Sequence, residues 1–162
     1  MSEVFPGRFT AAPPADARAV FLIGLRINTV RGLPKALPVI NAMPRMLKFL
    51  SQHPESGMLG FHNWFGRTTI LLSYWRSAED VQRFASDPNA PHAPAWREFN
   101  KKIGASPHVG VWHELYTIRP GDSEGVYVNM PRFGMAAVNE HLAVGDGMRT
   151  SKQRMVAGQP AS

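Results

Sequence analysis

The chain has 162 residues, close to the usual size of one domain, and 44% of them are hydrophobic, so it can bury a core of its own. Its 18 basic residues outnumber 12 acidic ones, for a formal net charge of +6, but they are dispersed along the chain rather than gathered into a stripe, which argues against nucleic-acid binding. The absence of cysteine excludes disulfides, thiolate metal sites and a cysteine nucleophile, and there is no run of about eighteen apolar residues to span a membrane, so we expect a cytoplasmic protein with no membrane partner.

The N-terminal third of the chain predicts an arm, a strand and a helix. Residues 1–17 carry several prolines and little periodicity, which is typical of a flexible N-terminal arm. Residues 18–28 are apolar on both faces, as in a buried strand. Residues 34–53 place apolar side chains three or four positions apart and predict a helix, which Pro38 and Pro44 should kink or split.

Two strands, two helical segments and a last long strand follow. Residues 58–65 and 68–76 predict a hairpin with a short glycine-containing link. Ser77 can cap a helix, and the acidic residues after it suit the positive end of a helix dipole. A second helical segment runs from 92 to 103, and residues 108–118 alternate like a strand.

Beyond this strand the pattern weakens. Residues 126–128 predict a short strand, residues 134–144 a short helix, and the last fifteen or so residues a mobile end. We therefore expect one folded domain over residues 18–130 and a partly disordered C-terminal extension over residues 131–162.

The predicted order of elements is β-α-β-β-α-β. This order consists of two β-α-β repeats, which together form a ferredoxin-like α+β fold with helices on one face of a four-stranded antiparallel sheet. The middle strands are too rich in aromatic and branched side chains to leave the other face in water. Pairing two sheets would cover it, so we expect a homodimer arranged as a dimeric α+β barrel.

Two histidines are the strongest candidates for chemistry. His92 shares the apolar stripe of the segment 92–103, and alternation places His113 on an apolar face of the strand 108–118. Both imidazoles should point into one hydrophobic interior, as a base, a proton shuttle or a metal ligand, or as structural side chains bonded to the backbone. Sequence motifs of zinc proteases, serine hydrolases and phosphate-binding loops are absent.

Aromatic side chains gather on the predicted hairpin and on the second helical segment. They could form the wall of a pocket for a small apolar or aromatic molecule, or pack in the core and the dimer interface. Arg76, at the end of the hairpin, could hold an anionic oxygen of that molecule or lie in solvent. The predicted ligand-binding side chains are Trp64, Trp75, Trp96, Phe99 and Arg76.

Four short segments resemble known families. They are residues 73–77 (SYWRS), His92 with Trp96, residues 111–114 (VWHE) and residues 126–131 (VYVNMP). Together they are similar to a bacterial and fungal family of monooxygenase-like proteins in the dimeric α+β barrel superfamily, over about residues 18–140. The Tyr-Trp-Arg-Ser and His-Glu segments also resemble the haem-dependent aldoxime dehydratases of the same barrel architecture.

Resemblance to the antibiotic-biosynthesis monooxygenases of this superfamily implies oxygenation of an electron-rich phenol or anthrone without a cofactor. It implies that a base such as His113 deprotonates the substrate and that the carbanion itself reduces dioxygen. Tyr74, Trp64 and Asn63 would then position the ring and its oxygens.

Resemblance to the aldoxime dehydratases implies haem instead. His92 matches the position of their iron-binding histidine and His113 that of their distal acid–base histidine, while their serine and arginine have no counterpart by motif. An imidazole on an apolar helix face beside Trp96 and Phe99 suits an axial ligand. Three functions stay open: a cofactor-free monooxygenase, a haem protein with His92 as metal ligand, and a ligand-binding dimer that is not an enzyme.

Overall fold

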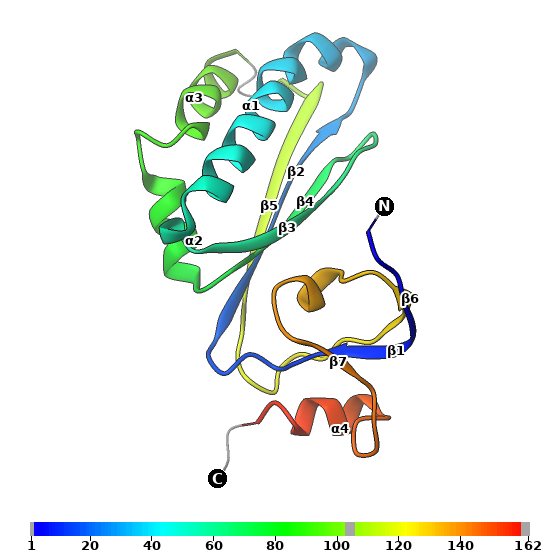
Figure 1. Ribbon diagram of the computed structural model, residues 1–162. Coiled ribbons are helices and arrows are strands. Elements are labelled where there is room, and N and C mark those ends of the chain that lie inside the picture. The colour runs from blue at the N-terminus through cyan, green and yellow to red at the C-terminus, as the bar shows by residue number, and fades with distance from the viewer. Residues whose placement is uncertain (1, 103–105, 160–162) are drawn as a thin grey trace.

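The computed structural model describes residues 2–102 and 106–159, apart from the side chains of Ala95, Phe99, Asn100 and Lys102. Its main body is an antiparallel four-stranded sheet in the order β3-β4-β2-β5, with helices against one face (Figure 1). The expected ferredoxin-like α+β arrangement is confirmed. The elements of this body are β2 (Arg18–Ile27), α1 (Leu33–Gln52), β3 (Met58–Trp64), β4 (Ile70–Trp75), α2 (Ala78–Ser86), α3 (His92–Lys102) and β5 (Val109–Ile118).

Helix α1 runs without a break through Pro38 and Pro44. A proline inside a helix removes a hydrogen bond and costs roughly 3 kcal/mol, which is why the sequence predicts that the helix could split. Burial of Ala36, Leu47 and Leu50 against the sheet holds the two halves in one helix. Among the described residues, α1 included, no helix combines the length and the apolar character needed to cross a membrane.

The start of α2 matches the capping that the sequence predicts. The Ser77 hydroxyl accepts a hydrogen bond from the backbone N–H of Asp80 at 3.1 Å. The buried carboxylate of Asp80 binds the side chains of Arg76 and Arg83. Arg76 also donates to the carbonyl of Glu55 at 2.7 Å, so the charged groups at the start of α2 tie this helix to the turn before β3.

A second antiparallel sheet, in the order β6-β1-β7, lies beside the main body (Figure 1). The sequence predicts a flexible arm over residues 1–17, whereas the structure forms strand β1 (Phe5–Ala11), paired with β6 (Tyr127–Met130) and β7 (His141–Ala143). The register of β1 shifts at Pro6 and Gly7, where Gly7 has a φ of +100°. A Pro-Gly pair that suggests a loop is therefore an irregularity inside a strand.

The C-terminal segment is also more ordered than the sequence predicts. In place of a helix over residues 134–144, the chain forms a 3₁₀ turn, η3 (Gly134–Ala137), and then β7. Within the end that is expected to be mobile, α4 (Ser151–Val156) begins with a capping box made by Thr150 and Gln153. Pairing with β1, which is distant in the sequence, turns part of the predicted helix into strand.

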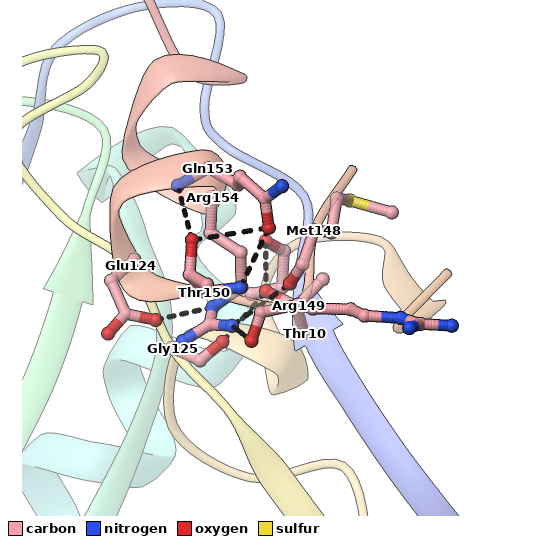
Figure 2. A network of polar contacts seen from close by, with 9 residues as sticks. Thr10, Glu124, Gly125, Met148, Arg149, Thr150, Gln153 and Arg154 are labelled. Carbon is pink, nitrogen blue, oxygen red and sulfur yellow. Dashed lines mark hydrogen bonds and ion pairs between the residues drawn. The ribbon is translucent and has the colours of Figure 1, made fainter. Parts of the chain in front are cut away.

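A buried arginine anchors α4 (Figure 2). The side chain of Arg154 is 5% exposed, and its Nε donates to the carboxylate of Glu124 at 2.7 Å. Its Nη1 donates to two backbone carbonyls of the loop before α4, at 2.9 and 3.1 Å. The Thr10 hydroxyl donates to the carbonyl of Gly125 at 2.7 Å, so β1, the loop before β6 and α4 are joined in one network.

The two faces of the main sheet have different neighbours. Ala19, Leu25 and Trp75 point toward the helices and are buried there. On the other face, Val20 and Tyr74 lie opposite the turn η3 and the residues after it. The chain itself therefore covers part of the face for which the sequence predicts a dimer partner.

Candidate functional site

His92 and His113 border one apolar cluster on the helix-covered face of the sheet. The ring of His113, on β5, lies 5.9 Å from that of Phe21 on β2, between centroids. The ring of His92, the first residue of α3, lies 4.8 Å from that of Phe84 on α2. Phe21 and Phe84 both pack against the buried cluster that contains Trp75. Both imidazoles therefore lie at the margin of the same aromatic cluster.

The two imidazoles differ in exposure and hydrogen bonding. The Nε2 atom of His92 is 3.2 Å from the carbonyl oxygen of Ala85, and since that oxygen can only accept, Nε2 carries the proton. The Nδ1 atom of His92 is buried without a hydrogen-bond partner. His113 is exposed, because β5 is an edge strand, and this differs from the interior position that the sequence predicts.

The other predicted catalytic residues do not join His113. One row of paired residues across the sheet consists of Asn63, Leu71, Ile23 and His113. Asn63 and His113 are therefore at opposite edges, about 14 Å apart at the usual spacing of strands. Alternation places Tyr74 and Trp64 on the face opposite His113. The predicted grouping of these side chains around one substrate is not what the structure forms.

The predicted ligand-binding side chains also divide. Trp75 is 2% exposed and donates from Nε1 to a neighbouring serine hydroxyl at 2.9 Å, so it belongs to the core. Arg76 is engaged at the start of α2. Trp96 is 47% exposed on α3, and the side chain of Phe99 lies outside the described residues. Of this predicted set, Trp96 and Trp64 present exposed indole surface to a ligand.

A second cluster lies on the opposite face of the sheet, beneath η3. The Nε2 atom of His62 accepts a hydrogen bond from the N–H of Gly134 at 2.9 Å, and its ring lies 4.1 Å from that of Phe133. The Tyr127 hydroxyl accepts from a backbone N–H of the turn at 3.4 Å. Gly134 has a φ of +60°, and a Cβ there would lie 3.2 and 3.5 Å from the hydroxyls of Tyr127 and Tyr74. These contacts hold the turn η3 on the sheet.

Burial sets the protonation of this cluster. It raises the pKa of Tyr74 to about 12, with a smaller contribution from the nearby Tyr127. It also raises the pKa of Tyr127. Burial also lowers the pKa of His62. At neutral pH the cluster therefore holds two protonated phenols and a neutral imidazole.

His62 and Tyr127 are absent from the site that the sequence predicts. Two signals for them were present: the alternation that puts His62 beside Trp64 on one face of the hairpin, and the segment 126–131 that carries part of the family resemblance. Neither signal reveals that β6 brings Tyr127 to the main sheet, because that depends on its pairing with β1.

Two cavities are found near these elements. One, of about 10 Å³, lies between the open face of the sheet and the C-terminal segment and has room for about one water molecule. The other, of about 420 Å³, lies at the C-terminal end of α1. The first is lined by Pro14, Arg18, Val20, Leu59, Tyr74, Ile118, Met135, Val138 and Asn139. The second is lined by Leu50, Ser51, Pro54, Met58, Leu59, Gly60 and Phe61.

Haem is the cofactor that the dehydratase resemblance implies. The hydrogen bonding of His92 fits an axial ligand, since one ring nitrogen bonds to a carbonyl and the other has no hydrogen-bond partner. Neither of the two cavities is lined by His92, so neither offers a porphyrin a place beside it. Within the described ranges, no group of three or more His, Cys, Asp or Glu side chains could hold a metal ion.

The fold and these residues define an α+β protein whose ferredoxin-like sheet carries a histidine-bordered aromatic cluster. The chain belongs to the monooxygenase af470-like family, whose model matches residues 19–135, and the predicted resemblance is confirmed. Monooxygenase af470 of Aspergillus fumigatus is 28% identical to it over 149 residues, covering 80% of this chain and 53% of that protein. The chain thus spans about half the length of that relative. The enzyme class that the sequence predicts, a monooxygenase-like oxidoreductase, is the class of this family.

Two solved aldoxime dehydratases share the fold. The aldoxime dehydratase OxdRE, in complex with butyraldoxime, has a TM-score of 0.62 at 12% identity, covering 94% of this chain and 44% of that chain. A second aldoxime dehydratase has a TM-score of 0.57 at 16% identity, covering 96% of this chain and 46% of that chain. SnoaB, a cofactor-independent oxygenase from Streptomyces nogalater, has a TM-score of 0.43 at 17% identity, and the match covers 64% of this chain and 94% of that chain. At these identities the dehydratases support the fold alone.

Proposed function

We propose that this chain is a monooxygenase-like oxidoreductase that oxidises an apolar or aromatic small molecule beside His113. The observation that carries the proposal is the exposed imidazole of His113 at the margin of an aromatic cluster, next to Phe21. An accessible imidazole can take a proton from a bound molecule while the neighbouring aromatic surface holds its ring. Membership of a family described as monooxygenase-like supports oxidation as the reaction.

Packing accounts for several residues of the segments that resemble the family. Trp75 fills the core, Ser77 caps α2, and Tyr127 supports the turn η3. The two histidines are different, since His92 keeps a buried ring nitrogen without a partner and His113 faces solvent. A buried polar atom without a partner calls for a separate explanation, and a ligand beside these imidazoles would supply one.

The chemistry that His113 would begin is a proton transfer. The imidazole removes a proton from an activated C–H group of an anthrone or a similar electron-rich ring, and leaves a carbanion. The carbanion gives its electrons to dioxygen, the CH₂ group becomes a carbonyl, and the second oxygen atom leaves as water. The balance R₂CH₂ + O₂ → R₂C=O + H₂O needs no reductant other than the substrate.

Oxygen uptake by the purified protein, with a panel of anthrones and hydroquinones, tests this proposal. We expect one panel member or more to be consumed with an equal amount of dioxygen, and labelled dioxygen to place its label in the product. Failure of the whole panel to stimulate uptake counts against the proposal, and release of hydrogen peroxide in place of labelled product shows an oxidase.

A haem protein is the second candidate, favoured by the partnerless Nδ1 of His92. For this candidate, protein from haem-replete cells shows a Soret band that His92→Ala abolishes. His108→Ala is the matched control and keeps the band, because His108 lies in the loop before β5 and bonds to the Thr29 hydroxyl at 2.8 Å. If no Soret band forms even after haem is added, this candidate is rejected.

We further propose that two copies of the chain pair through the part of the open sheet face that η3 leaves free. Trp64 and Tyr116 on this face are 42% and 51% exposed. Sedimentation at micromolar concentration is expected to show a dimer, and Trp64→Glu a monomer. Phe61→Glu is the control, since Phe61 is 38% exposed on the other face of the same strand and should leave the dimer intact. A monomeric native chain contradicts the pairing.

A further inference from the structure

One flank of α1 leaves apolar side chains exposed. Leu33, Leu37 and Ile40 are 47%, 53% and 37% exposed, and their spacing of four and three residues places them on one face. This flank adjoins the buried side of the helix, because Ala36 follows Leu33 by three residues and Leu47 follows Ile40 by seven, but the three side chains are not themselves buried. These three side chains, together with the exposed Val30 before them and the exposed Pro44 after them, form a surface that we name the α1 ridge.

The charges around the α1 ridge are of one sign. The segment from residue 30 to residue 53 contains no aspartate and no glutamate. It contains Arg31, Lys35, Arg45 and Lys48, all of which are exposed. Arg45 and Lys48 follow the ridge within the next helical turn. An exposed apolar stripe on a helix whose charges are all basic is the composition of helices that lie on anionic membrane surfaces.

We propose that the α1 ridge docks on the surface of an anionic lipid bilayer. The apolar side chains enter the boundary between headgroups and acyl chains, and the basic side chains of the same segment attract the acidic headgroups. The expectation of no membrane partner rests on the lack of a long apolar run, which concerns helices that span a bilayer and not a helix that lies on it.

The charge favours a lipid surface over a second copy of this chain. A second copy that met this surface face to face would bring basic residues against basic residues, which costs energy. An anionic lipid surface carries the opposite charge instead.

The test is flotation of the full chain with vesicles of phosphatidylcholine alone and of phosphatidylcholine mixed with phosphatidylserine. We expect binding to the mixed vesicles only, weakened by added salt because charge attraction is screened. Leu37→Glu is expected to weaken binding at least about tenfold, since it places a carboxylate among the headgroups. Arg45→Glu with Lys48→Glu is expected to weaken it by about tenfold or more.

Val156→Glu is the matched control, because Val156 is an exposed apolar side chain on α4 and should leave flotation unchanged. All the altered side chains are exposed, so circular dichroism should report a native fold in each variant. The proposal is overturned if the native chain fails to float with the mixed vesicles, or if Leu37→Glu and Val156→Glu float equally well. It is also overturned if Leu37→Glu instead dissociates a dimer of the native chain. None of these results depends on oxygen uptake.

Discussion

Replacing His113 with alanine is expected to lower the rate of substrate-dependent oxygen uptake by about 100-fold or more. A positioned general base contributes on the order of 10²–10⁴ to a rate, and His113 is the exposed imidazole at the margin of the cluster around Phe21. The exposed position means that the loss of the side chain should leave folding largely intact. The measurement is initial oxygen uptake with the best substrate of the panel, at equal protein concentration.

His62→Ala is the matched control for this substitution. His62 is also an imidazole on the same sheet, but alternation and pairing put it on the opposite face, under η3. We expect this variant to keep most of the oxygen uptake while the turn around Gly134 loosens, which amide exchange at that turn would report. The reverse outcome, activity lost in His62→Ala and kept in His113→Ala, would move the reaction to the face that carries Tyr74 and Tyr127.

Replacing Arg154 with alanine is expected to lower the free energy of unfolding by about 3 kcal/mol. Removal of one partner of a buried ion pair leaves the other charge without compensation, and such losses run to about 3–5 kcal/mol. Here the side chain of Arg154 is 5% exposed, that of its partner Glu124 is 23% exposed, and two loop carbonyls lose their donor as well. Chemical denaturation of the two proteins measures the difference.

Arg149→Ala supplies the comparison for Arg154→Ala. Arg149 pairs with Asp146 at 2.7 Å, but the two side chains are 74% and 91% exposed, and such surface pairs contribute about 0–1 kcal/mol. We expect its unfolding midpoint to stay close to that of the native chain. Equal losses in the two variants would show that burial of Arg154 does not stabilise the C-terminal segment.

The same ion pair makes stability depend on pH. The hydrogen bond from Arg154 is the largest cause that holds the pKa of Glu124 below its ordinary value of 4.5. A carboxyl with a lowered pKa in the folded chain contributes stability above its unfolded pKa and loses it as the pH falls through the folded pKa. When the pH is lowered from neutral to below about 4.5, the free energy of unfolding should therefore fall further for the native chain than for Arg154→Ala. Chemical denaturation at the two pH values measures both changes.

Local patterns in the sequence were sufficient for the main body of the fold. Apolar periodicity predicts β2, α1 and β5, and the acidic residues after Ser77 predict the start of α2, because each signal lies within one element. The elements that bear His92 and His113 follow from the same patterns. Local patterns predict that both imidazoles point into one hydrophobic interior; the rings of His92 and His113 do contact Phe84 and Phe21, but His113 is exposed.

The sequence by itself determined the order of the elements from β2 to β5, the apolar side of most of these elements, and the two imidazoles that differ from simple core residues. Only the tertiary structure decided that Tyr74 lies across the sheet from His113, that Phe5–Ala11 is a strand rather than an arm, and that η3 covers part of the open face. Those outcomes depend on strand neighbours such as Phe9 and Tyr127, which pair although they are far apart in the sequence. Periodicity reports which side of a strand is apolar, but the free energy of pairing and burial between distant segments selects what covers it.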